Sequence, residues 1–180
     1  LHARRRSGEP RVIAARNIAV ASGGYYRPRL LGIPGEMSPH VSHYYGGSRG
    51  MRRKRVLVVG GGNSAVEAAV ELAEHHAQVV LAYRGARLPK TQIKPWLLPR
   101  LAEQHRTGRI EIRYRTVPLS IGHDQAILLT RGNRQQTVDA ERVLLLTGYG
   151  PDYALLSRAG VPMHKQTGRP RFHPRSLQTG

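Results

Sequence analysis

Residues 55–74 decide the fold of this chain, and they read RVLVVGGGNSAVEAAVELAE. After Arg55 the next four residues are continuously apolar, as expected of a strand buried on both faces of a parallel sheet. Three glycines follow, and residues 64–75 then repeat apolar side chains at helical spacing. Residues 78–83 form the next apolar strand. The sequence therefore predicts a strand–turn–helix–strand unit and an α/β protein.

The turn of this unit, Gly60-x-Gly62-x-x-Ala65, is a dinucleotide-binding fingerprint. The first glycine allows the tight turn, the second lets a pyrophosphate approach the backbone, and the small Ala65 lets helix and strand pack closely. The phosphates then meet free N–H groups at the positive end of the helix. A chance glycine-rich turn is the alternative. The strand before the turn and the amphipathic helix after it favour the fingerprint.

The end of the second strand indicates which nicotinamide nucleotide binds. Sites for NAD place Asp or Glu there to bind the ribose 2′-hydroxyl, but this chain has no carboxylate between Glu74 and Glu103. Arg84 and Arg87 lie there instead, followed by Lys90. Arginine binds a 2′-phosphate through its planar fork, so the pattern predicts NADPH. Ordinary surface arginines are the alternative interpretation.

The rest of the chain divides into strands and loops around this unit. Apolar patterns predict strands over 2–6 and 12–21, a loop over 25–50, a helix over 95–104, and a strand over 110–114. A meander of three short strands follows over 119–138, and residues 143–146 form a last strand. No helix is predicted after Ser157. Residues 18–24 and 144–152 each read as an apolar strand that ends in Ser-Gly or Thr-Gly, which indicates a nicotinamide domain inserted into another domain.

Composition limits the function classes. The 180 residues carry 29 Lys and Arg against 11 Asp and Glu, so the net charge is +18. This charge is spread from Arg4 to Arg175 rather than gathered on one element, and we predict no nucleic-acid partner. Cysteine is absent, which excludes a thiol nucleophile or thiolate metal site within the chain. The nine histidines lack metal-ligand spacing, and no apolar run approaches the roughly 20 residues of a membrane span.

The chain resembles the thioredoxin-reductase-like pyridine nucleotide-disulfide oxidoreductases, and most closely the branch of bacillithiol-disulfide reductases. The resemblance covers nearly all 180 residues. In thioredoxin reductases a redox CxxC soon follows a Val-Ser dipeptide, but residues 41–45 here read VSHYY, so this segment excludes direct dithiol transfer of that kind. The matching segments are residues 24–26, 34–36, 42–45, 62–65, 83–85, 94–96 and 147–152.

The resemblance implies two dinucleotide cofactors, NADPH and FAD, and no metal. It implies a Rossmann-like NADPH-binding domain over 51–140, with three layers including a β-meander, between parts of an FAD-binding domain over 1–50 and 141–180. No catalytic residue is predicted within the chain. The residues implied on the NADPH side are Gly60, Gly61, Gly62, Asn63, Ser64, Ala65, Glu67, Tyr83, Arg84, Arg87 and Lys90. Those implied on the FAD side are Gly23, Gly24, Thr147, Gly148 and Asp152.

The function implied is that of a cytoplasmic flavoprotein that takes hydride from NADPH and reduces a low-molecular-weight disulfide. The resemblance also implies that the chain is an interior part of a homo-oligomeric protein, whose FAD fingerprint and reactive cysteine precede residue 1. Three alternatives stay open: a flavin monooxygenase, an NADPH-binding module without catalysis, and a basic nucleic-acid-binding protein. Residues 94–96, Lys-Pro-Trp, have no function that the sequence explains.

Overall fold

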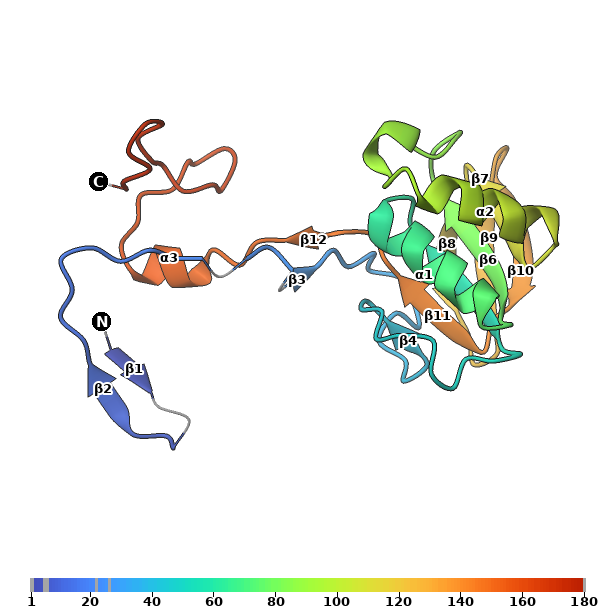
Figure 1. Cartoon of the computed structure of the whole chain (residues 1–180), viewed down its shortest axis with the longest axis horizontal. Coiled ribbons are helices and arrows are strands. Elements are labelled where there is room, and N and C mark those ends of the chain that lie inside the picture. The colour runs from blue at the N-terminus through green and yellow to red at the C-terminus, as the bar shows by residue number, and fades with distance from the viewer. Residues whose placement is uncertain (1, 5–6, 22, 26, 180) are drawn as a thin grey trace.

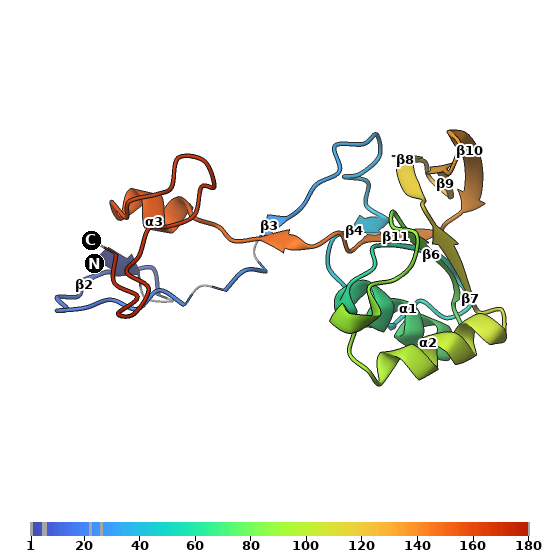
Figure 2. The same ribbon diagram turned by 90° about the horizontal axis from the view of Figure 1, so that it is seen from above.

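The computed structural model describes residues 2–4, 7–21, 23–25 and 27–179. A packed body contains the two longer helices and the larger sheets, and two extended segments lead away from it (Figure 1). The N-terminal hairpin and the C-terminal segment lie at the same end of this arm, away from the body, in both views (Figure 2). The body positions the predicted site, and the arm carries the segments expected to flank it.

The centre of the body is a parallel sheet of five strands. Its order is β4-β11-β5-β6-β7, and every neighbouring pair is parallel. β6 and β7, which follow β5 in the chain, therefore lie on one side of β5, and β11 and β4 lie on the other. The strands are β4 (Val41–Ser42), β5 (Arg55–Val59), β6 (Gln78–Tyr83), β7 (Ile110–Tyr114) and β11 (Arg142–Leu145).

Helices cover one face of this sheet, and alternate side chains of β5 explain why. Val56 and Val58 pack against α1 (Asn63–Glu74) and α2 (Leu97–Arg106), whereas Leu57 and Val59 point to the other face. Successive side chains of a strand point in opposite directions, so a strand covered on both faces must be apolar throughout. A short 3₁₀ turn, η1 (Lys90–Gln92), lies between β6 and α2.

A three-stranded antiparallel meander covers the opposite face. Its order is β10-β9-β8, and Leu128 and Val138 pack under the sheet beside Leu57. The predicted α/β fold, with a parallel sheet between helices and a meander, is confirmed. The strands are β8 (Val117–Ile121), β9 (Gln125–Thr130) and β10 (Arg134–Asp139).

The arm departs from the predictions. The strand predicted over 12–21 is wrong, because among the described residues only β2 (Pro10–Val12) forms there, paired with β1 (His2–Arg4). Val20 is 48% exposed, so these apolar residues have no neighbouring strand to bury them. Two short strands, β3 (Arg27–Pro28) and β12 (Tyr149–Gly150), pair across the arm, and α3 (Ala154–Arg158) is a five-residue helix that the sequence did not indicate.

Candidate functional site

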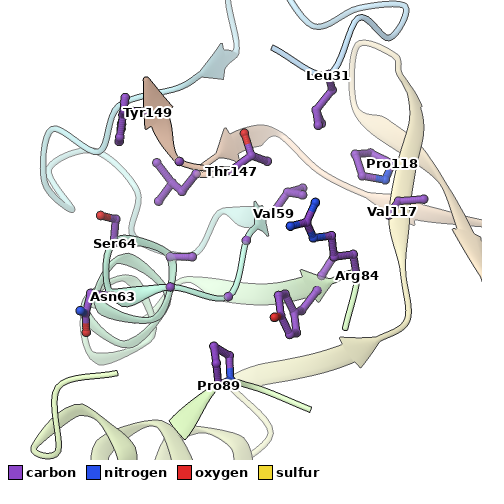
Figure 3. Close-up of a pocket in the computed structure, with 18 of the residues that line it drawn as sticks. Leu31, Val59, Asn63, Ser64, Arg84, Pro89, Val117, Pro118, Thr147 and Tyr149 are labelled. Atoms are coloured by element: carbon purple, nitrogen blue, oxygen red, sulfur yellow. The ribbon is translucent and has the colours of Figure 1, made fainter. Parts of the chain in front are cut away.

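A cavity of about 700 Å³ opens at the carboxyl ends of β5, β6 and β11 (Figure 3). The strand order reverses between β5 and β11, since β6 and β7 continue on the other side of β5, and parallel α/β sheets bind ligands at such a switch point. Of the predicted site residues, the cavity is lined by Gly60, Gly61, Gly62, Asn63, Ser64, Ala65, Tyr83, Arg84, Gly24, Thr147 and Gly148. Glu67, Arg87, Lys90, Gly23 and Asp152 lie outside its lining.

Gly60 is required by the turn itself. Its φ is +146°, a backbone conformation that side chains disfavour, and its N–H donates to the carbonyl of Ala82 at 3.0 Å. A Cβ at this position would lie 2.4 Å from the Leu146 carbonyl oxygen and 2.9 Å from the Ala65 Cβ. The first and third positions of the fingerprint thus hold β5, α1 and the end of β11 close together.

Gly62 has a different environment. Its φ is −88°, which any residue adopts, and a Cβ there would meet no protein atom within 4 Å. The space that a side chain would fill is therefore open to a ligand. No side chain of the described residues caps α1, so the first N–H groups of the helix have no intrahelical partner. An open approach and unpaired N–H donors are what a pyrophosphate needs.

The ring of Tyr83 explains why a glycine lies at each of its two edges. A Cβ on Gly61 would lie 2.4 Å from this ring, and one on Gly85 would lie 2.5 Å from the other edge of the same ring. The ring is wedged between the fingerprint turn and the chain after β6. Tyr83 therefore forms part of the cavity wall and fixes the point at which Arg84 leaves the sheet.

Arg84 brings a positive charge to the cavity. Figure 3 shows it across the cavity from Asn63 and Ser64 at the start of α1. No carboxylate within the described part of the chain pairs with Arg84, so its guanidinium is available to an anion. Arg87 and Lys90 are exposed on the segment that follows. Because the chain turns inward at Leu88, which is buried, the three cations do not line one wall.

The residues implied on the FAD side hold the arm together where it meets the body. Thr147 Oγ1 donates to the carbonyl of Arg29 at 2.8 Å. Asp152 pairs with Arg27 at 3.1 Å and accepts from the N–H of Ala154 at the start of α3. Their side-chain oxygens already have protein partners, and it is the backbone of Gly24 and Gly148 that faces the cavity.

Two tyrosines complete this wall, and sequence analysis missed them as a pair. The rings of Tyr25 and Tyr149 lie 4.7 Å apart, and both line the cavity. Tyr149 Oη also donates to the carbonyl of His43 at 2.5 Å. The two tyrosines come from segments far apart in sequence, and only the pairing of β3 with β12 brings them together.

A buried carboxylate supports the loop beneath these rings. Glu36 accepts from the N–H groups of Leu31 and Gly32 at 2.8 and 2.7 Å, and its Oε1 lies 3.0 Å from His43 Nε2. Burial raises the pKa of Glu36, but the hydrogen bonds from His43 and from the backbone outweigh burial, and the pKa lies below its ordinary value. Leu31 and Ile33 of this loop line the cavity.

Comparison with known families agrees with this geometry. Residues 7–180 match the family of pyridine nucleotide-disulphide oxidoreductases. The chain belongs to that family. It is 35% identical over 160 residues to bacilliredoxin reductase Bdr of Bacillus subtilis, a match that covers 89% of the chain and 49% of the relative. It is 30% identical over 169 residues to a ferredoxin–NADP reductase of Gluconobacter oxydans, covering 87% of the chain and 48% of that relative.

Superposition on solved structures supports the same fold. The bacillithiol disulfide reductase Bdr of Bacillus cereus superposes with a TM-score of 0.88 at 32% identity, covering 99% of the chain and 55% of that structure. A thioredoxin reductase of Lactococcus lactis superposes at 0.69 with 21% identity, covering 84% of the chain and 50% of that structure, which supports the fold alone. The chain thus spans about half the length of these relatives.

Proposed function

We propose that this chain is the NADPH-binding part of an FAD-dependent oxidoreductase that reduces a low-molecular-weight disulfide. The observation that carries the proposal is the cavity itself, which combines the open space at Gly62 with the unpaired guanidinium of Arg84. The disulfide substrate rests on the Bdr relatives, at 35% and 32% identity. When bound, NADPH supplies a hydride and FAD passes the electrons to the disulfide.

The residues of the cavity have separate tasks in this proposal. The first N–H groups of α1 bind the pyrophosphate, and Gly62 keeps its path clear. Arg84 binds the 2′-phosphate, which NADH lacks. Thr116 and Pro118, at the other side of the strand ends, line the cavity beside Tyr83.

The proposed domain division follows from the same arrangement. We assign residues 51–140 to the NADPH-binding domain, and 1–50 and 141–180 to parts of an FAD-binding domain. The parallel sheet reaches past these bounds, since β4 and β11 are two of its strands. Gly24, Thr147 and Gly148 form the wall that faces the arm, which fits a cavity closed by the flavin domain. The homo-oligomer and the cytoplasmic location stay predictions.

None of the helices within the described residues is long and apolar enough to cross a bilayer. The positive charge has partners of its own in several places. Arg100 lies 2.6 Å from Glu74, and Arg106 lies 2.8 Å from Glu103. Such pairs favour a solvated basic surface over a nucleic-acid interface.

The test is NADPH oxidation, followed at 340 nm, with the FAD-loaded protein and a panel of small disulfides. We expect oxidation that depends on the disulfide and releases two thiols for each NADPH. Equal rates with and without disulfide, accompanied by oxygen consumption, would favour the flavin monooxygenase instead. Nucleotide binding without any oxidation would favour an NADPH-binding module that has no catalytic role.

A further inference from the structure

The segment from Arg84 to Lys94 runs from the end of β6 back to the start of α1. It carries four cations, Arg84, Arg87, Lys90 and Lys94, and no carboxylate. Leu88 and Ile93 are 6% and 3% exposed and pack into the helix-side core. Because they are buried, these two apolar side chains fix how deeply the segment sits in the protein. The orientation of the segment depends on further contacts.

A hydrogen bond between distant parts of the chain supplies that contact. The backbone N–H of Lys94 donates to Asn63 Oδ1 at 2.7 Å, across 31 residues of sequence. Asn63 is the first residue of α1, and the N-cap before it is Gly62, which has no side chain to serve the helix N–H groups. The side-chain amide oxygen of Asn63 instead ties the basic segment to the fingerprint turn.

The side chain of Lys94 adds a second, weaker connection to the same helix. Its Nζ lies 3.2 Å from Glu67 Oε2 and 5.7 Å from the centre of the Trp96 ring. All three side chains are largely exposed, and exposed pairs contribute little. The backbone bond to Asn63 is therefore the stronger of these two connections between α1 and the end of the segment, whose beginning is held by the bond from the Arg115 N–H to the Gly85 carbonyl at 2.9 Å. It also gives residues 94–96 a structural explanation.

We propose that Asn63 is a positioning residue that sets the preference for NADPH over NADH. The inference rests on the proposed function, because it takes Arg84, the cation of the segment that lines the cavity, as the 2′-phosphate site. The pyrophosphate is common to both nucleotides and meets the turn at Gly62, whereas only the 2′-phosphate meets the segment. A change that loosens the segment should therefore lower the affinity for NADPH and leave that for NADH nearly unchanged.

Two substitutions at Asn63 separate this role from a general loss of structure. Asn63→Ala removes the acceptor, and we expect the ratio of NADPH to NADH affinity to fall about three- to tenfold, the range of one hydrogen bond. Asn63→Asp keeps an acceptor oxygen but adds a negative charge beside the pyrophosphate. Both affinities should then fall by a similar factor, and their ratio should stay within about twofold of the wild type.

Lys94→Ala is the matched control. It removes the ion pair with Glu67 and leaves the backbone N–H that Asn63 accepts. We expect it to change the ratio by less than twofold. All four proteins are titrated with NADPH and NADH by calorimetry, and their melting temperatures are compared.

The outcomes decide the inference. A ratio unchanged in Asn63→Ala, in a wild type that prefers NADPH, overturns the role of Asn63 and leaves the proposed function intact. A wild type that binds both nucleotides equally overturns the NADPH assignment and this inference with it. If Asn63→Ala does not fold, Asn63→Asp still decides, because a lost preference there contradicts the retained acceptor.

Discussion

The two outer glycines of the fingerprint predict opposite responses to the same substitution. In Gly62→Ala the new methyl enters space that no protein atom occupies within 4 Å, at a φ of −88° that alanine adopts. In Gly60→Ala the methyl meets the Leu146 carbonyl at 2.4 Å, at a φ of +146°. The first change should spare the fold and block the ligand, and the second should damage the fold.

The magnitudes follow from these environments. Alanine is a poorer N-cap than glycine by roughly 0.5–1 kcal/mol, and its smaller unfolded-state entropy returns about 0.4–1 kcal/mol. Gly62→Ala should therefore change the free energy of unfolding by less than about 0.5 kcal/mol. Crowding of the bound pyrophosphate should cost about 1–3 kcal/mol, or roughly 5- to 150-fold in NADPH affinity. Gly60→Ala should lose about 2 kcal/mol or more of stability from strain and overlap.

Calorimetric titration with NADPH and a thermal melt of each variant form the assay. We expect the melting temperature of Gly62→Ala to stay within about 2 °C of the wild type, and that of Gly60→Ala to fall by roughly 4–8 °C. Unchanged NADPH affinity in a folded Gly62→Ala protein would refute the reasoning, because the open space would then not be the path of the pyrophosphate.

Three further predictions concern single side chains. Arg84→Ala should weaken NADPH binding about 10- to 100-fold and NADH binding less than twofold by calorimetry, and an equal loss for both would contradict the 2′-phosphate assignment. The depressed pKa of Glu36 stabilises the fold above the ordinary carboxyl value of 4.5 and ceases to do so as the pH falls through the lower folded value, so melting temperatures of Glu36→Gln should depend less on pH in that range. A parallel pH profile would exclude this contribution. Tyr149→Phe should cost about 1 kcal/mol of stability in urea unfolding through the lost bond to the His43 carbonyl, and no change would show that water replaces the bond.

The body was predictable because its information is local. The apolar run of β5, the glycine turn and the helical period of α1 lie within 20 residues, and each agrees with the others. The meander was equally predictable, because its three short strands are separated by turns in the sequence. The family resemblance was correct for the same reason, since most of its motifs lie in this body and at its edge.

The arm and the finer details of the site depend on distant partners. Residues 13–21 have the composition of a strand, but a strand forms only when it pairs with another strand, and residues 13–21 belong to none of the strands among the described residues. The bond from Lys94 to Asn63 spans 31 residues, so no spacing rule reveals it. The inward turn at Leu88 likewise separates Arg84 from the other two cations, although all three look equivalent in the sequence.

The pairing of β3 with β12 has a consequence for how the molecule assembles. Thr147 and Arg29, which hydrogen-bond at its base, are 118 residues apart. Bringing the ends of a flexible loop of that length together costs about 4 kcal/mol of chain entropy. When the body is folded, the two chain ends are already close together and this entropy is already lost. The pairing of β3 with β12 therefore depends on the folded body and is lost when the body unfolds. Amide protons of β12 should exchange at least as fast as those of β11, because the folded body holds the bases of both segments of the arm together.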